Sequence, residues 1–516
     1  MMKHRNAVLG WALVLAMPLM AADQVRTDAG TVEGTASTDS KIREFKGIPY
    51  AAPPVGKLRW RAPQPVASWT DVRKTVDFGP RCTQGHVYDD MVFRDKGGSE
   101  DCLYLNVWTP AASADAHLPV MVWFHGGGFI AGASSEPRQD GENLARKGVV
   151  VVSMNYRLGV FGFLAHPELT RESDHNSSGN YGLLDQVAAL TWVHKNIAAF
   201  GGDPNTVTIF GESAGSMSVS ALLASPLTDG LLERAIGESG AFFGATLSAS
   251  PRMSAEFIGT EFAKSMKAKS IADLRAKSED EILQASLKPN SHFAPDIDGY
   301  FLPEPVSALY GSEMESHVPL LAGWNADEGD AQAIFDKEKP TAKGFAKRLH
   351  VLYGAKADDL LRVYPASSDE EARRSAADLA GDRFIAYGTW KWIEMHLASS
   401  KSPVYRYEFD QAPPPAAGST ESRGAYHSAE IEFVFGVLAS KKLPWRADDM
   451  KLSDLMSTYW SNFAKTGDPN GEGLPKWPQY DADGHYQVMH LSANPAPAPD
   501  AHRERYLLLD TISAMR

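Results

Sequence analysis

Short runs of apolar residues stand out in the first half of the chain. They cover residues 120–124, 149–154 and 207–210, and each is too short for an ordinary helix. A strand that is buried on both faces of a sheet shows this pattern, because neither of its faces meets water. The runs therefore predict buried strands of a parallel sheet.

Segments with helical periodicity lie between and after these runs. Apolar residues recur at roughly helical spacing between positions 181 and 200, and Gly201 and Gly202 predict the end of that helix. Residues 214–223 predict another helix, and the charged segment 250–287 predicts a helical excursion over the sheet. Further strands are predicted at residues 31–34, 42–48, 318–322 and 404–409. Strands that alternate with helices predict an α/β fold, with a mostly parallel central sheet and helices on both faces.

The N-terminus has the pattern of an export signal. A basic start at residues 3–5 precedes an apolar run over residues 7–20, and small residues follow at Ala21 and Ala22. The run is shorter than the roughly 20 apolar residues that a membrane-spanning helix needs. We therefore expect a signal peptide over residues 1–22 and a protein that is exported, either periplasmic or secreted. No internal repeat or long linker divides the rest, so residues 23–516 predict a single domain.

Composition and charge exclude several classes of function. Of the 516 residues 43% are hydrophobic, which is enough for a large core and excludes a disordered chain. The net charge of -13 leaves no basic surface for nucleic acid, and we expect no metal, no cofactor and no stable membrane anchor. The chain has two cysteines, Cys82 and Cys102, and in an exported protein an even number favours a disulfide. Their spacing alone is equally compatible with two separate buried thiols.

The strongest chemical signal is a serine flanked by glycines. A serine hydroxyl becomes a nucleophile when a sharp turn between a strand and a helix exposes it beside a base, and the crowding of that turn requires a glycine two positions away on each side. One segment meets these conditions directly after the predicted strand 207–210: Gly211-Glu212-Ser213-Ala214-Gly215. The similar segment 237–241 has alanine in place of the second glycine, so we expect Ser239 to support the site rather than to react.

A glycine-rich segment predicts the other half of such a site. It follows the predicted strand 120–124 and reads His125-Gly126-Gly127-Gly128-Phe129. Attack on an ester creates an oxyanion that needs fixed hydrogen-bond donors, and glycines let backbone N–H groups approach it closely. The N–H group of Ala214 is the donor that the serine turn itself supplies.

The acid and the histidine of a catalytic triad should follow the serine along the chain. The acid is expected after the strand 318–322, where spacing alone does not choose between Asp327 and Glu328. Several histidines come later, and His427 suits the role because its loop follows the strand 404–409. The other candidates are His350, His396, His485, His490 and His502.

Motifs across nearly the whole chain after the signal resemble those of the type-B carboxylesterase/lipase family, which includes bacterial para-nitrobenzyl esterases and the cholinesterases. They lie at residues 45–51, 99–107, 180–186, 201–204, 298–299 and 463–470. The resemblance implies an α/β-hydrolase fold with large helical excursions. This chain has Ser216 where the family usually has glycine, a difference that bears on helix packing rather than on catalysis.

The resemblance also implies roles for individual residues. Ser213 would be the nucleophile, Glu328 rather than Asp327 the acid, and His427 the base. The oxyanion donors would be the N–H groups of Gly127, Gly128 and Ala214, with Glu212 as a carboxylate near the histidine and a disulfide between Cys82 and Cys102.

Together these features predict a serine esterase that acts on a small-molecule ester. The same groups can attack a carbamate, a lactone or an amide, and some relatives of the family are binding proteins that have lost the triad. The loop 82–102 lacks a clear counterpart of the tryptophan with which cholinesterases hold choline, so cholinesterase activity is not predicted. An ordinary imidazole predicts activity that rises between about pH 5 and 8. Five aromatic residues are candidates for a pocket lining, although each also suits a core: Tyr88, Phe93, Phe242, Phe243 and Trp324.

Overall fold

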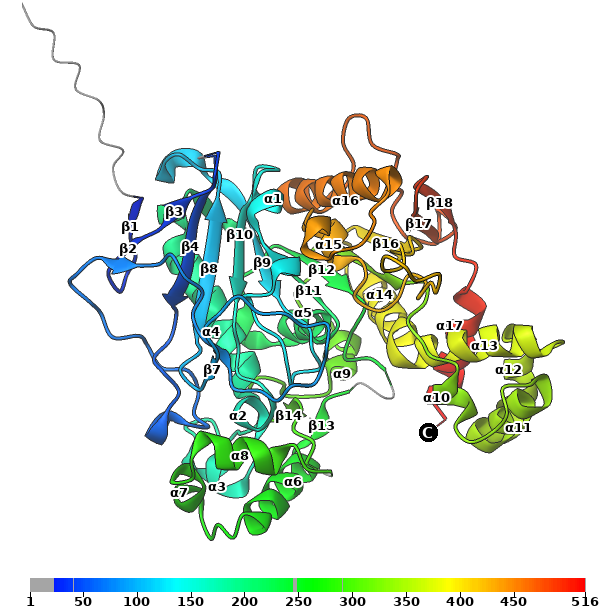
Figure 1. Ribbon diagram of the computed structural model, residues 1–516. Coiled ribbons are helices and arrows are strands. Elements are labelled where there is room, and N and C mark those ends of the chain that lie inside the picture. The colour runs from blue at the N-terminus through cyan, green and yellow to red at the C-terminus, as the bar shows by residue number, and fades with distance from the viewer. Residues whose placement is uncertain (1–22, 40, 245–247, 290, 516) are drawn as a thin grey trace, which may run out of the picture.

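The computed structural model describes residues 23–39, 41–244, 248–289 and 291–515, and the predicted signal peptide lies outside them. An 11-stranded sheet runs through the molecule (Figure 1). Its strands pair in the order β18 (Ala496–Pro499), β17 (Gln487–Leu491), β16 (Val404–Phe409), β15 (Leu320–Asn325), β12 (Arg234–Glu238), β11 (Gly202–Glu212), β9 (Leu118–Phe124), β10 (Val150–Met154), β8 (Tyr104–Thr109), β4 (Arg43–Pro49) and β3 (Thr35–Ala36).

The seven strands from β17 to β10 are parallel to their neighbours, and antiparallel strands close both edges of the sheet. Each predicted strand of the sheet corresponds to one of these elements, apart from residues 31–34, which form β2 (Thr31–Glu33) in a small separate sheet with β1 (Gln24–Arg26) and β5 (Arg73–Lys74). The mostly parallel α/β architecture that the pattern predicts is therefore confirmed.

Both faces of the sheet are buried, as the apolar runs require. Along β9, Val120 and Val122 belong to one core cluster, whereas Met121 and Trp123 belong to the other. Helices supply the matching surfaces on the two sides. The first side has α4 (Tyr181–Asn196), α5 (Ala214–Ala224), α9 (Val306–Gly311) and α14 (Tyr387–Ser399), and the second has α1 (Glu142–Ala145), α15 (Ile431–Val434) and α16 (Ala447–Thr466).

Two helical excursions extend from this core, at the bottom and at the lower right of Figure 1. The first contains α6 (Arg252–Ser265), α7 (Ile271–Arg275) and α8 (Glu279–Ser286), where the sequence predicts an excursion over residues 250–287. The second contains α10 (Gln332–Phe335), α11 (Ala342–Tyr353), α12 (Ala357–Val363) and α13 (Asp369–Gly381). A π-helical turn, Asp382–Ala386, joins α13 to α14.

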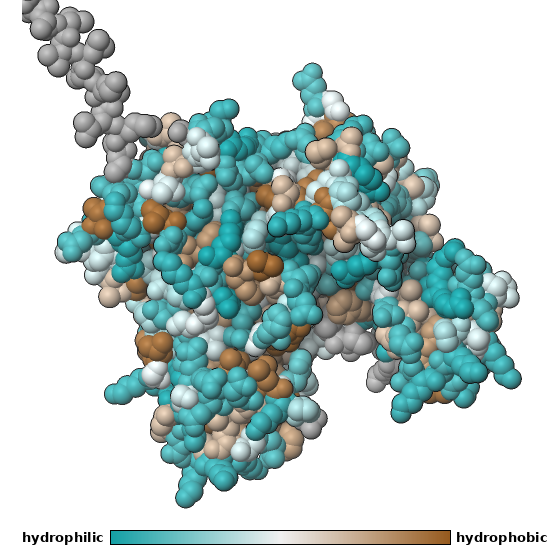
Figure 2. All heavy atoms as spheres, in the orientation of Figure 1, coloured by the Kyte–Doolittle hydropathy of each residue, from teal (hydrophilic) through white to brown (hydrophobic). Residues whose placement is uncertain are grey.

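The remaining α-helices and strands are short, apart from the C-terminal helix. They are α2 (Gly159–Phe163), α3 (Pro167–Glu172), α17 (Arg503–Ser513), the pair β6 (Arg81–Cys82) and β7 (Gly98–Ser99), and the pair β13 (Ser250–Pro251) and β14 (Asp296–Ile297). The face drawn in Figure 2 is largely hydrophilic, with apolar side chains in small separate groups. Among the helices of the described residues, none is both long and apolar enough to span a membrane.

Candidate active site

The predicted serine turn lies at the carboxyl end of β11. Ser213 has a backbone φ of 54° between the last residue of the strand and the first residue of α5. A side chain at Gly215 would collide with the carbonyl group of Phe124 on β9, so the helix can start this close to the sheet only with glycine there. Ser213 is partly exposed while Glu212 and Ala214 are buried. The turn thus presents its hydroxyl at the surface of a packed core.

Three side chains from distant segments meet at this turn. His427 Nε2 lies 3.0 Å from Ser213 Oγ, and His427 Nδ1 lies 2.6 Å from Glu328 Oε2. The other oxygen of Glu328 accepts hydrogen bonds from Ser239 Oγ at 2.6 Å and from the N–H group of Asn325 at 2.9 Å. A carboxylate at Nδ1 favours the tautomer with its proton on that nitrogen, which leaves Nε2 free to accept the serine proton.

The two consecutive acids after β15 point in different directions. The carboxylate of Asp327 accepts a hydrogen bond from the N–H group of Ala425 at 2.7 Å, and the N–H group of Asp327 donates to the carbonyl of Ala425 at 3.0 Å. Of the two acids that spacing leaves open, Glu328 is therefore the one that meets His427. Asp327 instead joins the loop after β15, here called the acid loop, to the loop that carries His427, here called the histidine loop.

Asn325 makes a second connection between these loops, and no sequence motif marks it. Its side-chain amide donates hydrogen bonds to the carbonyl of Tyr426 at 2.8 Å and to Glu430 Oε2 at 2.6 Å. Asn325 and Glu430 are both buried. The amide thus contacts the chain on both sides of His427 while its backbone N–H group holds Glu328.

The glycine segment lies directly beside Ser213. Within the described part of the chain, the N–H groups of Gly127, Gly128 and Ala214 donate no hydrogen bond, so all three donors remain available. Gly127 has a φ of 105°, which lets the segment turn back toward the serine. Free backbone N–H groups beside a serine are the kind of donor that a negatively charged oxygen needs.

A disulfide-closed loop covers these glycines. Cys82 and Cys102 are bonded, as the sequence predicts. Between them, the hydroxyl of Tyr88 lies 3.3 Å from the position of a Cβ atom on Gly128, and the methyl group of Met91 lies 3.1 Å from that of Gly127. The loop therefore forms one wall beside the glycine segment.

Buried carboxyl groups dominate the electrostatics. Burial lowers the pKa of His427, but the negative charges of Glu328 and Glu212 outweigh it and raise that pKa above its ordinary value. Glu212 Oε1 lies 3.3 Å from His427 Nε2. Burial raises the pKa of Glu212 to about 7, and burial with the nearby Glu212 and Glu328 raises the pKa of Glu430 to about 8. The site thus favours a positive charge on the imidazole.

The aromatic candidates lie in different environments. Trp324 is buried with the Arg406 guanidinium 4.1 Å from its ring, and Phe242 and Phe243 are also buried. Phe93 carries the Arg81 guanidinium 4.8 Å from its ring centroid. Tyr88 is the exposed member of the predicted set.

An aromatic residue outside that set contacts His427. Phe384 is 42% exposed, and its ring lies edge-to-face with the imidazole at a centroid distance of 5.2 Å. No motif marks this residue, because a π-helical turn places it and such a turn has no clear sequence signature.

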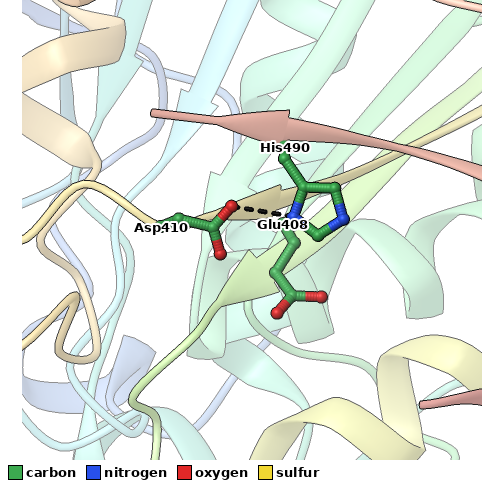
Figure 3. A group of neighbouring side chains, drawn as sticks. All are labelled: Glu408, Asp410 and His490. Atoms are coloured by element: carbon green, nitrogen blue, oxygen red, sulfur yellow. Dashed lines mark hydrogen bonds and ion pairs between the residues drawn. The ribbon is translucent and has the colours of Figure 1, made fainter. Parts of the chain in front are cut away.

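The remaining histidines have other partners or lie elsewhere. His396 is buried on α14, and its Nε2 lies 2.8 Å from the carbonyl of Val318. His490 on β17 forms a group with Glu408 on β16 and with Asp410 directly after that strand. Figure 3 shows the Asp410 carboxylate directed at the imidazole, and its oxygen lies 2.8 Å from Nδ1. These residue types can ligate a metal, but His490 is already engaged by Asp410, and the Arg406 guanidinium lies 3.9 Å from Glu408. We therefore describe the group as an ion-pair cluster between two strands.

Comparisons with known proteins show which family and fold this chain shares. The model of the carboxylesterase family matches residues 21–507. The chain is 38% identical to fumonisin B1 esterase of Sphingopyxis macrogoltabida, with 94% of this chain and 91% of that protein covered. It is 39% identical to para-nitrobenzyl esterase of Bacillus subtilis (strain 168), with coverage of 88% and 92%. A solved structure of a PNB esterase superposes with a TM-score of 0.80 at 34% identity, covering 95% of this chain and 99% of that one.

Proposed function

Because the chain belongs to the carboxylesterase family, we propose that it hydrolyses carboxylic esters through an acyl-enzyme on Ser213, with His427 as the base and Glu328 as the acid. One observation carries this assignment. Glu328, His427 and Ser213 form a continuous row of hydrogen-bond contacts of 2.6 and 3.0 Å, although 99 and 214 residues separate the partners along the chain. When an acid, a histidine and a serine lie in this order, the histidine can take the proton of the hydroxyl as the serine oxygen attacks.

The reaction proceeds in two acyl transfers. His427 Nε2 takes the proton of Ser213 as Oγ bonds to the ester carbonyl carbon, and the N–H groups of Gly127, Gly128 and Ala214 hold the resulting oxyanion. The bond from that carbon to the alcohol oxygen then breaks, and the imidazolium gives its proton to the departing alcohol. Water attacks the acyl-enzyme by the same route, which releases the acid and restores Ser213.

Two further residues support the imidazole. Ser239 holds Glu328 in the orientation that meets Nδ1, through its 2.6 Å hydrogen bond. Glu212, 3.3 Å from Nε2, stabilises the imidazolium that forms in each step. Neither residue forms a bond to the substrate, because the acyl group is carried by Ser213.

The substrate is a small-molecule ester. The relatives' names mention fumonisin B1 and para-nitrobenzyl compounds, which differ from each other, so they support the ester class and not one compound. We also propose that the protein is exported. The N-terminal pattern supports this, as does the bond between Cys82 and Cys102, because disulfides persist mainly in oxidising compartments.

A fluorophosphonate probe tests the proposal directly. Such a probe phosphonylates an activated serine, and mass spectrometry of the digested protein should locate it on Ser213. Prior incubation with an ester substrate should slow the labelling. An unlabelled protein, or a label on another residue, would contradict the assignment and favour a binding protein without catalysis.

A comparison of bond types defines the reaction further. We expect kcat/KM to be highest for esters when an ester, a carbamate, a lactone and an amide of similar size are compared. A higher value for any of the other three would replace the ester in this proposal while keeping the same residues.

A further inference from the structure

We infer that Phe384 is a specificity residue that binds the alcohol half of the ester, and that the preferred substrates carry an apolar, bulky alcohol. This inference rests on the proposed function. Its first support is the combination of exposure and position: Phe384 is 42% exposed, and its ring contacts His427. An exposed aromatic ring beside a reactive group is a ready contact for a ligand.

The position of Phe384 is fixed by its neighbours. Asp382, at the start of the π-helical turn, is buried, and its carboxylate accepts a hydrogen bond from the Tyr364 hydroxyl at 2.6 Å. Ile385 and Ala386 at the other end of the turn are buried as well. With both ends of the turn anchored in the core, the ring of Phe384 is held outward.

The turn also packs directly on the acid loop. The Cβ position of Gly381 lies 3.2 Å from Glu328 Cβ, and a side chain at Gly329 would collide with the backbone at Gly381. Phe384 is therefore set relative to Glu328 and His427 by backbone contacts. Such preorganisation lowers the conformational cost of binding a ligand against the ring.

The chemistry of the reaction assigns the ring to one side of the substrate. His427 protonates the departing alcohol, so the alcohol oxygen must lie next to Nε2 when the bond breaks. The ring of Phe384 lies edge-to-face with this imidazole at 5.2 Å, whereas Tyr88 and Met91 lie by the glycines that would hold the carbonyl oxygen. We therefore place the groups attached to the alcohol oxygen, rather than the acyl group, against Phe384.

Two ester series with purified Phe384→Ala test the inference. One series keeps the acid as butyrate and varies the alcohol from methyl to butyl to benzyl. The other keeps the alcohol as methyl and varies the acid over similar sizes. We expect the ratio of kcat/KM for benzyl to methyl butyrate to fall about tenfold, with methyl butyrate changed less than about threefold, because one apolar contact is worth roughly this factor. Phe384→Leu should retain part of the benzyl preference.

Phe257→Ala is the matched control. Phe257 is also an exposed phenylalanine, at 66%, but it lies on α6 in the helical excursion. Its removal should leave both series unchanged.

Three outcomes would overturn the inference. An equal loss for all esters would make Phe384 a support for His427, and a loss that follows the size of the acid would place it on the acyl side. An unchanged benzyl-to-methyl ratio would remove it from recognition. If the wild-type protein hydrolysed no ester, the proposed function itself would fail, and that result is distinct from the other three.

Discussion

Two neighbouring strands end in the same tripeptide, and only one of them presents a serine to His427. β11 ends in Gly211-Glu212 before Ser213, and β12 ends in Gly237-Glu238 before Ser239, with the glycines and the glutamates paired in register. Both serines have positive φ, 54° and 55°. The N–H group of Ser213 donates to the carbonyl of Glu238, and that of Ser239 donates to the carbonyl of Gly323. The second turn therefore repeats the first, one strand further along the sheet.

The two turns differ in the element that comes next and in the groups that they face. Ser213 is followed by α5 and remains partly exposed beside His427, whereas Ser239 is fully buried against Glu328. The acids differ similarly: Glu212 approaches the imidazole, while Glu238 accepts a hydrogen bond from Trp460 Nε1 at 2.7 Å in the core. The same local turn therefore places one serine beside His427 and the other beside Glu328. The loop that carries His427, and not the turn itself, makes the difference.

Among replacements in the two turns, that of Ser213 should have the largest effect on kcat. We expect Ser213→Ala to lower kcat for a para-nitrophenyl ester by a factor on the order of 10⁶, because the three residues act as a unit. Ser457→Ala, at a buried serine on α16, serves as the control and should retain activity. Wild-type turnover in Ser213→Ala would disprove the mechanism.

The two glutamates should respond differently to neutral replacements. Glu212→Gln removes a charge near Nε2 and should lower kcat about 10- to 100-fold, since it stabilises the imidazolium. It should also move the rise of kcat/KM to lower pH, because the raised pKa of His427 depends partly on Glu212 and activity requires the unprotonated ring. In the wild type that rise is expected above the pH range of an ordinary imidazole.

Glu238→Gln is the matched comparison. Burial, with the nearby Glu430, raises the pKa of Glu238 well above its ordinary value, and its carboxyl group contacts Trp460 in the core rather than His427. We expect kcat to change less than about threefold, which is well under the loss predicted for a charge that acts in the transition state. Equal pH shifts in both variants would show that the two turns do not differ electrostatically.

Ser239→Ala should have a smaller effect than Glu212→Gln. It removes one of the two hydrogen bonds to Glu328 Oε1, and the bond from the Asn325 N–H group remains. A hydrogen bond to a charged group contributes about 1.5–3 kcal/mol, so a loss of about tenfold in kcat is expected when the second donor compensates in part. Fluorophosphonate labelling of Ser213 should persist, and its loss would indicate that Ser239 does more than hold the acid.

The smallest effect is expected at Ser216, on the helix after the turn at Ser213. Its hydroxyl is buried and donates a hydrogen bond to the carbonyl of Gly240, in the second turn, at 2.5 Å. Ser216→Gly should leave kcat within about twofold and lower the free energy of unfolding by about 2 kcal/mol, from one lost hydrogen bond and one glycine in a helix. Thermal denaturation monitored by circular dichroism measures this. An unchanged midpoint would show that the two turns are not coupled here.

Much of the fold was predictable because a buried parallel strand leaves a direct trace in the sequence. The apolar run at residues 120–124 lies within β9, whose burial on two faces explains that run. The helix predicted over residues 181–200 appears as α4 and a short 3-10 turn, Ile197–Phe200, which Gly201 caps. The turn at Ser213 was equally predictable from the sequence, since it requires glycines at fixed distances from the serine.

Features that depend on contacts between distant loops were not predictable from the pattern. Spacing leaves Asp327 and Glu328 equivalent, and only the hydrogen bonds of Asp327 with Ala425 turn the one acid away from His427. The same holds for Asn325, whose two amide contacts lie about a hundred positions further along the chain. Phe384 depends on one π-helical turn, which changes the direction of a side chain without a marker in the sequence.

The bond between Cys82 and Cys102 has a practical consequence for producing the protein. In a reducing cytoplasm this bond would not persist, which would leave the segment with Tyr88 and Met91 untethered beside Gly127 and Gly128. We expect such preparations to have a lower specific activity, because the proposed oxyanion donors would lose one of the walls that flank them. Titrating free thiols before any kinetic comparison would separate these molecules from variants that are truly impaired.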